Sequence, residues 1–220
     1  IRVHVRGSHL TLGQEVERGV PVVLQAEDER LEMPAESSGR LQLARWLASP
    51  ENPLTARVAV NRIWGWHFGR GLVPTVDNFG NLGERPINPE LLDWLASEFI
   101  ASGWSIKTMH KRIMLTDVYQ RSSDAVESSL AIDPDNQYQW RTNVRRLSAE
   151  QIRDSLLDVS GLLDEGRGTT TISIPKWDLV FNHESKDITT YDSYKRPLYL
   201  PIIRNNLYDG FTLFDYTAAD

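Results

Sequence analysis

The side chains that could do chemistry are concentrated in residues 52–80. Within this stretch Arg57, Asn61, Trp64 and Phe68 follow one another at spacings of 4, 3 and 4, which places them along one face of a helix. Basic, amide and aromatic side chains on one face are typical of a pocket for a polar ligand such as a carbohydrate. One interpretation is therefore a polar and aromatic cleft beside the glycine-bearing loop that follows this helix, lined by Arg57, Asn61, Trp64 and His67.

A second interpretation places the same helix in the protein interior. Much of its remaining circumference is apolar, and a helix that is apolar nearly all round is usually buried. Arg57, Asn61 and Arg62 would then need partners, because an unpaired buried charge costs on the order of several kcal/mol. The carboxylates available on later helices are Asp93, Glu150 and Asp154. We favour this buried network of ion pairs and hydrogen bonds over the cleft.

His67 belongs to the cleft in the first interpretation and caps or packs the helix end in the second. With Asp77 and also Asp93 it could ligate a metal ion, but the sequence has no H-x-x-x-H or H-E-x-x-H pair, and His110 and His183 stand alone in the sequence. A histidine at a helix C-terminus is more often stabilised by the negative end of the helix dipole. We therefore predict no metal site.

No catalytic signature is present. The sequence lacks the G-x-S-x-G, G-x-x-x-x-G-K-[ST] and strand-linked G-x-G-x-x-G motifs. The 220 residues include no cysteine, which excludes disulfides, thiolate metal sites, a cysteine nucleophile and covalent haem from this stretch of chain. A net charge of −6 argues against binding to nucleic acid or anionic membranes. We expect neither a catalytic site nor a membrane span.

Tryptophan is abundant, and six of the seven tryptophans lie between residues 46 and 140. Each aromatic side chain can bury about 150–250 Å², so core anchors for short helices are the favoured interpretation. The alternative is a platform for sugar rings. Trp64 and Trp66 point roughly 200° apart on a helix, so both cannot serve one pocket.

The elements that would position these residues are mostly helices. Alternating apolar residues predict a strand at residues 1–7, with residues 21–24 as its partner. Capping residues, prolines and apolar periodicity predict helices at residues 41–47, 53–68, 89–103, 106–113 and 149–163. Residues 169–174 and 198–203 have the β-branched or alternating character of strands.

The predicted fold is mainly α, with four to six helices and a small irregular β element at the N-terminus and near the C-terminus. We divide it into an N-terminal strand segment and linker (1–40), a helical core domain (41–165) and a β or irregular C-terminal segment that packs on the core (166–220). The first residue is not methionine, and the apolar residues at 213–216 lack an obvious partner. We therefore expect the chain to be part of a longer protein.

Several runs of residues resemble a large domain family of unknown function. Planctomycetes and related bacteria carry this domain at the C-terminal end of long extracytoplasmic proteins, and the resemblance covers essentially the whole chain. One departure is Asn88, where such proteins usually have histidine before Pro-Glu; asparagine caps a helix equally well. The matching runs are NPLTARV at 52–58, NRIW at 61–64, HFGRGLV at 67–73, DNFG at 77–80, PELLDWLA at 89–96 and RLSAE at 146–150, with Ile152-Arg153-Asp154.

The resemblance implies context more than mechanism, because it transfers no catalytic residues. It implies a periplasmic or secreted protein with an upstream cytochrome c-like domain, which would hold haem c, and no cofactor in this part of the chain. The function that we expect is a non-enzymatic interaction or scaffold module docking with that cytochrome c-like domain. The alternative is a carbohydrate-binding or carbohydrate-processing domain, with polysaccharide as its partner.

Overall fold

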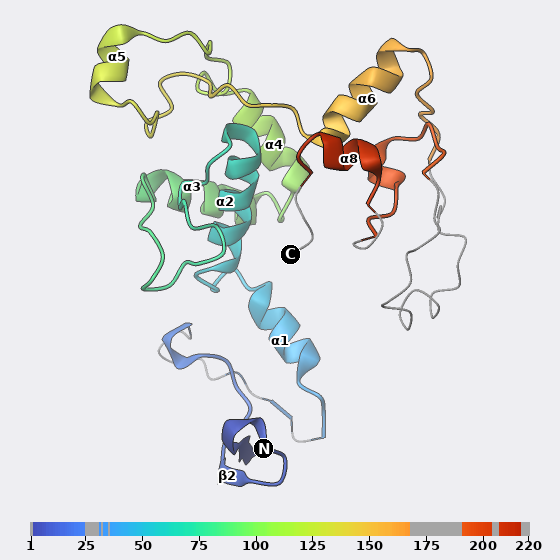
Figure 1. The fold of residues 1–220 in the computed structure, drawn as a ribbon. Helices are drawn as coiled ribbons and strands as arrows, with labels where there is room; N and C mark the ends of the chain where they lie inside the picture. Colours follow the sequence, from blue (N-terminus) through green and yellow to red (C-terminus); the bar gives the residue numbers. More distant parts are fainter. Residues whose placement is uncertain are drawn as a thin grey trace. The chain divides into compact units, whose positions relative to one another are not determined.

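A computed structural model describes residues 2–24, 31, 33–34, 36–167, 191–203 and 207–216. The chain forms two compact units, Ile1–Val144 and Arg145–Asp220, whose elements Figure 1 labels in chain order. The second unit begins just before a helix that we had assigned to the core domain. The three predicted domain ranges stay a prediction, and each unit is described here by itself.

The core of the first unit is built by three helices. They are α2 (Thr55–Phe68), α3 (Pro89–Ala101) and α4 (Ile106–Met114). The side chains that meet between them are large and apolar, and Val60, Met109 and Ile113 are almost completely buried. Among these three helices, α2 and α3 contact each other most extensively. The surroundings of α2 are therefore set largely by α3 and by the loop between the two helices.

Local capping explains where these helices begin and end. Asn88 accepts a hydrogen bond from the backbone N–H of Leu91 (3.0 Å), and Ser105 accepts one from Thr108 (3.2 Å), as their positions in the sequence predict. Gly69 adopts a left-handed conformation with φ of 83°, which ends α2. The predicted ends of these helices are thus confirmed to within a few residues.

The N-terminal β element has a different pairing from the one predicted. Strand β1 (Arg2–His4) pairs antiparallel with β2 (Leu12–Glu15), and a 3-10 turn, η1 (Val5–Gly7), lies between them. Residues 21–24 were the wrong partner, because Val22–Leu24 forms the 3-10 helix η2. A hairpin closes a much shorter loop than the predicted pairing, which costs less conformational entropy.

Helices α1 (Arg40–Leu47) and α5 (Glu127–Ile132) complete the first unit. The α1 helix was predicted and contains no buried residue. The six-residue α5 was not predicted, and it leads into a turn in which both carboxylate oxygens of Asp133 accept backbone N–H groups, from Gln137 and Tyr138. This turn shows how a side chain can supply the hydrogen bonds of a loop that has no regular structure.

The second unit contains α6 (Ala149–Val159), the 3-10 helix η3 (Pro197–Tyr199) and α8 (Asp209–Leu213). The capping box predicted at Ser148 and Gln151 is present. The strand expected at residues 198–203 is wrong over its first two residues, which belong to η3. Proline at position 197 has no N–H to give to a strand partner and fits the first turn of a helix instead.

The predicted fold class, mainly α with a small N-terminal β element, is confirmed. Seven α-helices lie in the described part of the chain, and the two that were not predicted, α5 and α8, are short. Near the C-terminus the described residues contain one isolated β-bridge, between Asp164 and Lys195. The strand predicted at residues 169–174 lies outside the described residues. No described helix is long and apolar enough to cross a bilayer.

Candidate functional site

The predicted cleft on α2 does not open to solvent at two of its four residues. Asn61 is completely buried and Trp64 is 6% exposed, within the apolar core. Trp64 packs against Phe68, with ring centroids 4.2 Å apart. The apolar faces of α3 and α4 cover this side of α2, so these two side chains serve the core rather than a ligand.

Asn61 holds a loop against the helix. Its Nδ2 donates to the carbonyl of Val73 (3.0 Å), and its Oδ1 accepts from the N–H of the same residue (2.8 Å). Val73 is itself buried, so the asparagine satisfies both polar groups of a buried peptide unit. The second interpretation expected Asn61 to be buried and hydrogen-bonded, and it is. Its partner is the backbone of Val73 rather than a side chain.

The arginines form ion pairs at the surface rather than in the interior. Arg57 Nε lies 2.7 Å from Asp93 Oδ1, and the two side chains are 37% and 58% exposed. Asp93 was among the predicted partners, but burial of this pair is wrong. Arg62 instead pairs with Asp77 (3.1 Å), which was not named as its partner. Long charged side chains reach solvent from a half-buried helix by extending their apolar stems along it, which explains the difference.

Glu150 and Asp154, the other two predicted partners, lie on α6 in the second unit. Both are partly exposed. Their pairing with residues of α2 stays a prediction.

His67 has a neighbour that the sequence did not indicate. Its Nε2 lies 2.7 Å from Nδ1 of His110 on α4, and the two rings meet edge to face with centroids 4.9 Å apart. Tyr119 packs on the same imidazole at 5.3 Å. The expectation that His110 stands alone is therefore wrong. Within the described ranges no group of three or more metal-ligating side chains is found.

The tryptophans divide between core and surface. Trp64 is buried and Trp104 packs on Phe99 at 5.4 Å, as core anchors would. Trp66 and Trp94 are more than half exposed, so the expectation of a core role is wrong for these two. Trp64 is buried whereas Trp66 is exposed, which confirms that the two side chains point in different directions from the helix.

An apolar groove lies between the end of α1 and the start of α2. Its volume is about 430 Å³. Helix α1 has no buried residue and three exposed leucines, of which Leu47 lines the groove and is 45% exposed. The side chains of the groove are mostly apolar; they come from Leu24, Trp46, Leu47, Asn52, Leu54, Thr55, Val58, Ala59 and Arg62.

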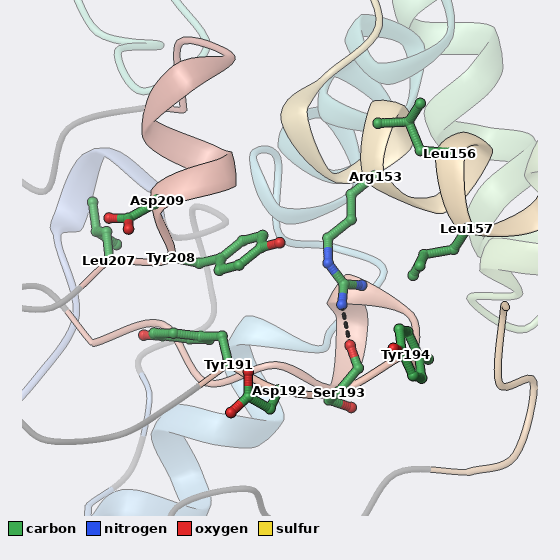
Figure 2. A pocket seen from close by; sticks show the side chains of 10 residues that line it. All are labelled: Arg153, Leu156, Leu157, Tyr191, Asp192, Ser193, Tyr194, Leu207, Tyr208 and Asp209. Carbon is green, nitrogen blue, oxygen red and sulfur yellow. Dashed lines mark hydrogen bonds between the residues drawn. The ribbon is translucent and has the colours of Figure 1, made fainter. Parts of the chain in front are cut away.

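A larger cavity, of about 660 Å³, lies within the second unit (Figure 2). Arg153 of α6 reaches into it and is only 8% exposed. Its Nη1 donates to the carbonyl of Lys195 (2.7 Å), and its Nη2 donates to the carbonyl of Ser193. The guanidinium also lies over the ring of Tyr208, with Cζ 5.5 Å from the ring centroid. Arg153 therefore fixes one wall of the cavity to α6.

A second contact fixes the same wall. Lys195 Nζ lies 2.6 Å from Asp164 Oδ2. The hydrogen bond from Lys195, together with one from the backbone N–H of Gly166, holds the pKa of Asp164 below its ordinary value. Residues 193–195 are thus held from both sides, which gives the cavity a defined shape.

Sequence reasoning did not find this cavity. Arg153 entered only as part of a matching run, and the residues opposite it come from segments about forty positions away. One signal was present, since five of the seven tyrosines lie between residues 191 and 216. An aromatic cluster of this kind in a short stretch indicates either a small core or a ligand site.

The chain matches the model of a protein family. The family model PSD1, described as a protein of unknown function (DUF1553), matches residues 39–220. Neither the curated proteins nor the solved structures include a significant match. The match covers most of the chain, including all lining residues of the cavity and all of those of the groove except Leu24.

Proposed function

We propose that this chain, which belongs to the PSD1 family of proteins of unknown function (DUF1553), is a non-enzymatic interaction module whose first unit docks a protein partner. The docking surface is the groove between α1 and α2. The observation that carries the proposal is that α1 buries none of its residues although it is rich in leucine.

Burial of this surface would supply the free energy of docking. Apolar surface removed from water contributes about 25 cal/mol per Å², and a large side chain seated in a groove is a common centre of binding energy. Trp46 and Leu47 of α1 line the groove, together with Leu54, which directly precedes α2, and Val58 of α2. A partner with a protruding apolar side chain fits this shape.

The charge around the groove indicates which kind of partner face would fit. Helix α1 carries Arg40 and Arg45 and no acidic residue, whereas Arg62, which lines the groove, is paired with Asp77. The chain as a whole has a net charge of −6, so this basic surface departs from its average. A partner face with carboxylates around an apolar centre would be complementary.

The partner that we propose is the cytochrome c-like domain of the same protein, and its location is periplasmic or secreted. This assignment is supported by the resemblance of the sequence runs to domains found downstream of such cytochromes. Haem c would belong to that partner. A domain joined through the same chain is present at an effective concentration in the millimolar range, so a modest affinity is enough.

The alternative, a carbohydrate site on α2, loses support because Asn61 and Trp64 are buried in the core. Arg57 and His67, the other two residues of that cleft, are engaged by Asp93 and His110. A carbohydrate function would need a different site.

The proposal is tested by adding the present chain, in increasing amounts, to the separate cytochrome c-like domain. Sedimentation velocity, detected through the haem absorbance, measures how much of that domain is in the complex. Leu47→Glu puts a charge into the groove at an exposed position. Leu82→Glu is the matched control, because Leu82 is 94% exposed and does not line the groove. We expect the first variant to bind at least about tenfold more weakly and the second to bind as the unaltered chain does.

Two results would refute the docking proposal. One is the absence of association at concentrations up to about 1 mM, where even a complex worth about 4 kcal/mol would form. The other is equal weakening by both variants.

A further inference from the structure

We infer that the cavity of the second unit is a binding site for a neutral carbohydrate ring. This goes beyond docking, because the cavity lies in the other unit of the chain. The inference rests on three features of the cavity: a buried guanidinium, tyrosine rings along the wall and two carboxylates.

The guanidinium of Arg153 offers hydrogen-bond donors that the described residues do not use. Arginine has five N–H donors, and the carbonyls of Lys195 and Ser193 each accept one. Within the described residues no carboxylate lies within ion-pair distance of Arg153. Among the described residues this cation, which is nine-tenths buried, is held by two carbonyls and the face of Tyr208, so it retains N–H donors for a ligand oxygen.

Tyrosine rings form part of the cavity wall. Tyr191 and Tyr208 lie with centroids 5.4 Å apart and their planes inclined by 46°. Phe211 packs edge to face on Tyr208 at 5.2 Å, which fixes that ring. Because Arg153 lies over the Tyr208 ring, the ring that we assign to the apolar C–H face of a pyranose is Tyr191, which also lines the cavity. A ring held in place adds little ordering entropy when the ligand binds.

The carboxylates decide the charge of the ligand. Asp192 and Asp209 are exposed, and Asp209 lies at the end of the cavity away from Arg153 (Figure 2). Two carboxylates against one guanidinium disfavour an anionic ligand. A cationic ligand is disfavoured in turn, because Arg153 already lies over Tyr208.

A neutral ring that carries several hydroxyls can hydrogen-bond both to the guanidinium and to the carboxylates. The guanidinium can only donate and the carboxylates can only accept, whereas a hydroxyl does both. Sites for small molecules have volumes of about 300–1,000 Å³, and the cavity lies within this range at about 660 Å³. Its lining of aromatic and leucine side chains with a few placed polar groups is typical of such sites.

The test uses the full chain and four defined oligosaccharides. Saturation-transfer NMR compares cellotetraose and mannotetraose, which are neutral, with tetragalacturonate, which is anionic, and with the chitosan tetramer, which is cationic. We expect at least one neutral tetrasaccharide to bind and the charged ones to bind more weakly. Binding of neither neutral probe, or preferential binding of a charged one, would overturn the inference.

Variants then place the binding in the cavity. Tyr191→Ala removes one ring, and we expect binding to weaken by roughly fivefold, the size of one aromatic contact. Tyr138→Ala is its control, because Tyr138 lies in the first unit and is 75% exposed. Asp192→Ala tests the same wall without touching a packed ring, and it is compared with Asp158→Asn, an exposed carboxylate of α6 outside the cavity lining.

The site is supported if Tyr191→Ala and Asp192→Ala weaken binding and both controls leave it unchanged. If Tyr191→Ala fails to fold, as judged by its melting curve, the decision rests on Asp192→Ala alone. Unchanged binding in Asp192→Ala would overturn the site. Because Leu47→Glu does not alter this cavity, the docking proposal can fail while this one holds, and the reverse is also true.

Discussion

Asn61→Ala should destabilise the first unit by about 3–4 kcal/mol. The side chain makes two hydrogen bonds to the peptide unit of Val73, at 2.8 and 3.0 Å. A typical hydrogen bond contributes about 1 kcal/mol net, and each buried group left without a partner costs about 1–3 kcal/mol. Because Val73 is only 2% exposed, water cannot easily replace the lost amide.

The loss can be measured by urea unfolding followed through tryptophan fluorescence. Six of the seven tryptophans lie in the first unit, so this signal reports mainly on that unit. Asn81→Ala is the matched control, since Asn81 lies exposed in the loop before α3, and it should change the free energy of unfolding by less than about 0.5 kcal/mol.

Hydrogen exchange at Val73 gives an independent readout. The backbone N–H of Val73 donates to the side-chain Oδ1 of Asn61, so this N–H should exchange much faster in the variant than in the unaltered chain. A loss of stability below about 1 kcal/mol, together with unchanged protection of this amide, would refute the assignment of Asn61 to the loop.

Three further predictions concern other contacts. Arg57→Ala should cost less than about 1 kcal/mol, because its pair with Asp93 is partly exposed; a cost of several kcal/mol in the same urea assay would restore the buried network. Gly71→Ala should lower the melting temperature, because the added Cβ would lie 2.7 Å from Nδ2 of Asn61. An unchanged melting curve would contradict this close approach. The lowered pKa of Asp164 beside Lys195 means that this pair stabilises the fold above the ordinary aspartate value of about 4, and the contribution is lost as the pH falls through the lower folded value. Stability measured against pH should therefore differ between the unaltered chain and Asp164→Asn at neutral pH and converge in acid; a constant difference would show that the charge is not responsible.

The parts of the fold that could be predicted are those set by local chemistry. Asn88, Ser105 and Ser148 each cap the helix that follows, because a side-chain oxygen can reach a backbone N–H two or three residues away in any context. Gly69 ends α2 for a similar reason, since glycine adopts a left-handed conformation without steric cost.

The contacts that could not be predicted join residues far apart in the chain. His67 and His110 are 43 positions apart, and Arg153 is 42 positions from its carbonyl partner Lys195. Composition and periodicity do not determine how distant segments align. The burial of Arg57 was overestimated because an apolar pattern around a helix does not reveal how far a long charged side chain extends toward water.

The most direct test of the docking proposal is hydrogen exchange of the full chain with and without the cytochrome c-like domain that we propose as its partner. We predict that the partner slows exchange in α1 and in the first turns of α2, residues 40–62, and leaves α4 unchanged. Slower exchange in α4 or the second unit, with residues 40–62 unaffected, would contradict docking at the groove.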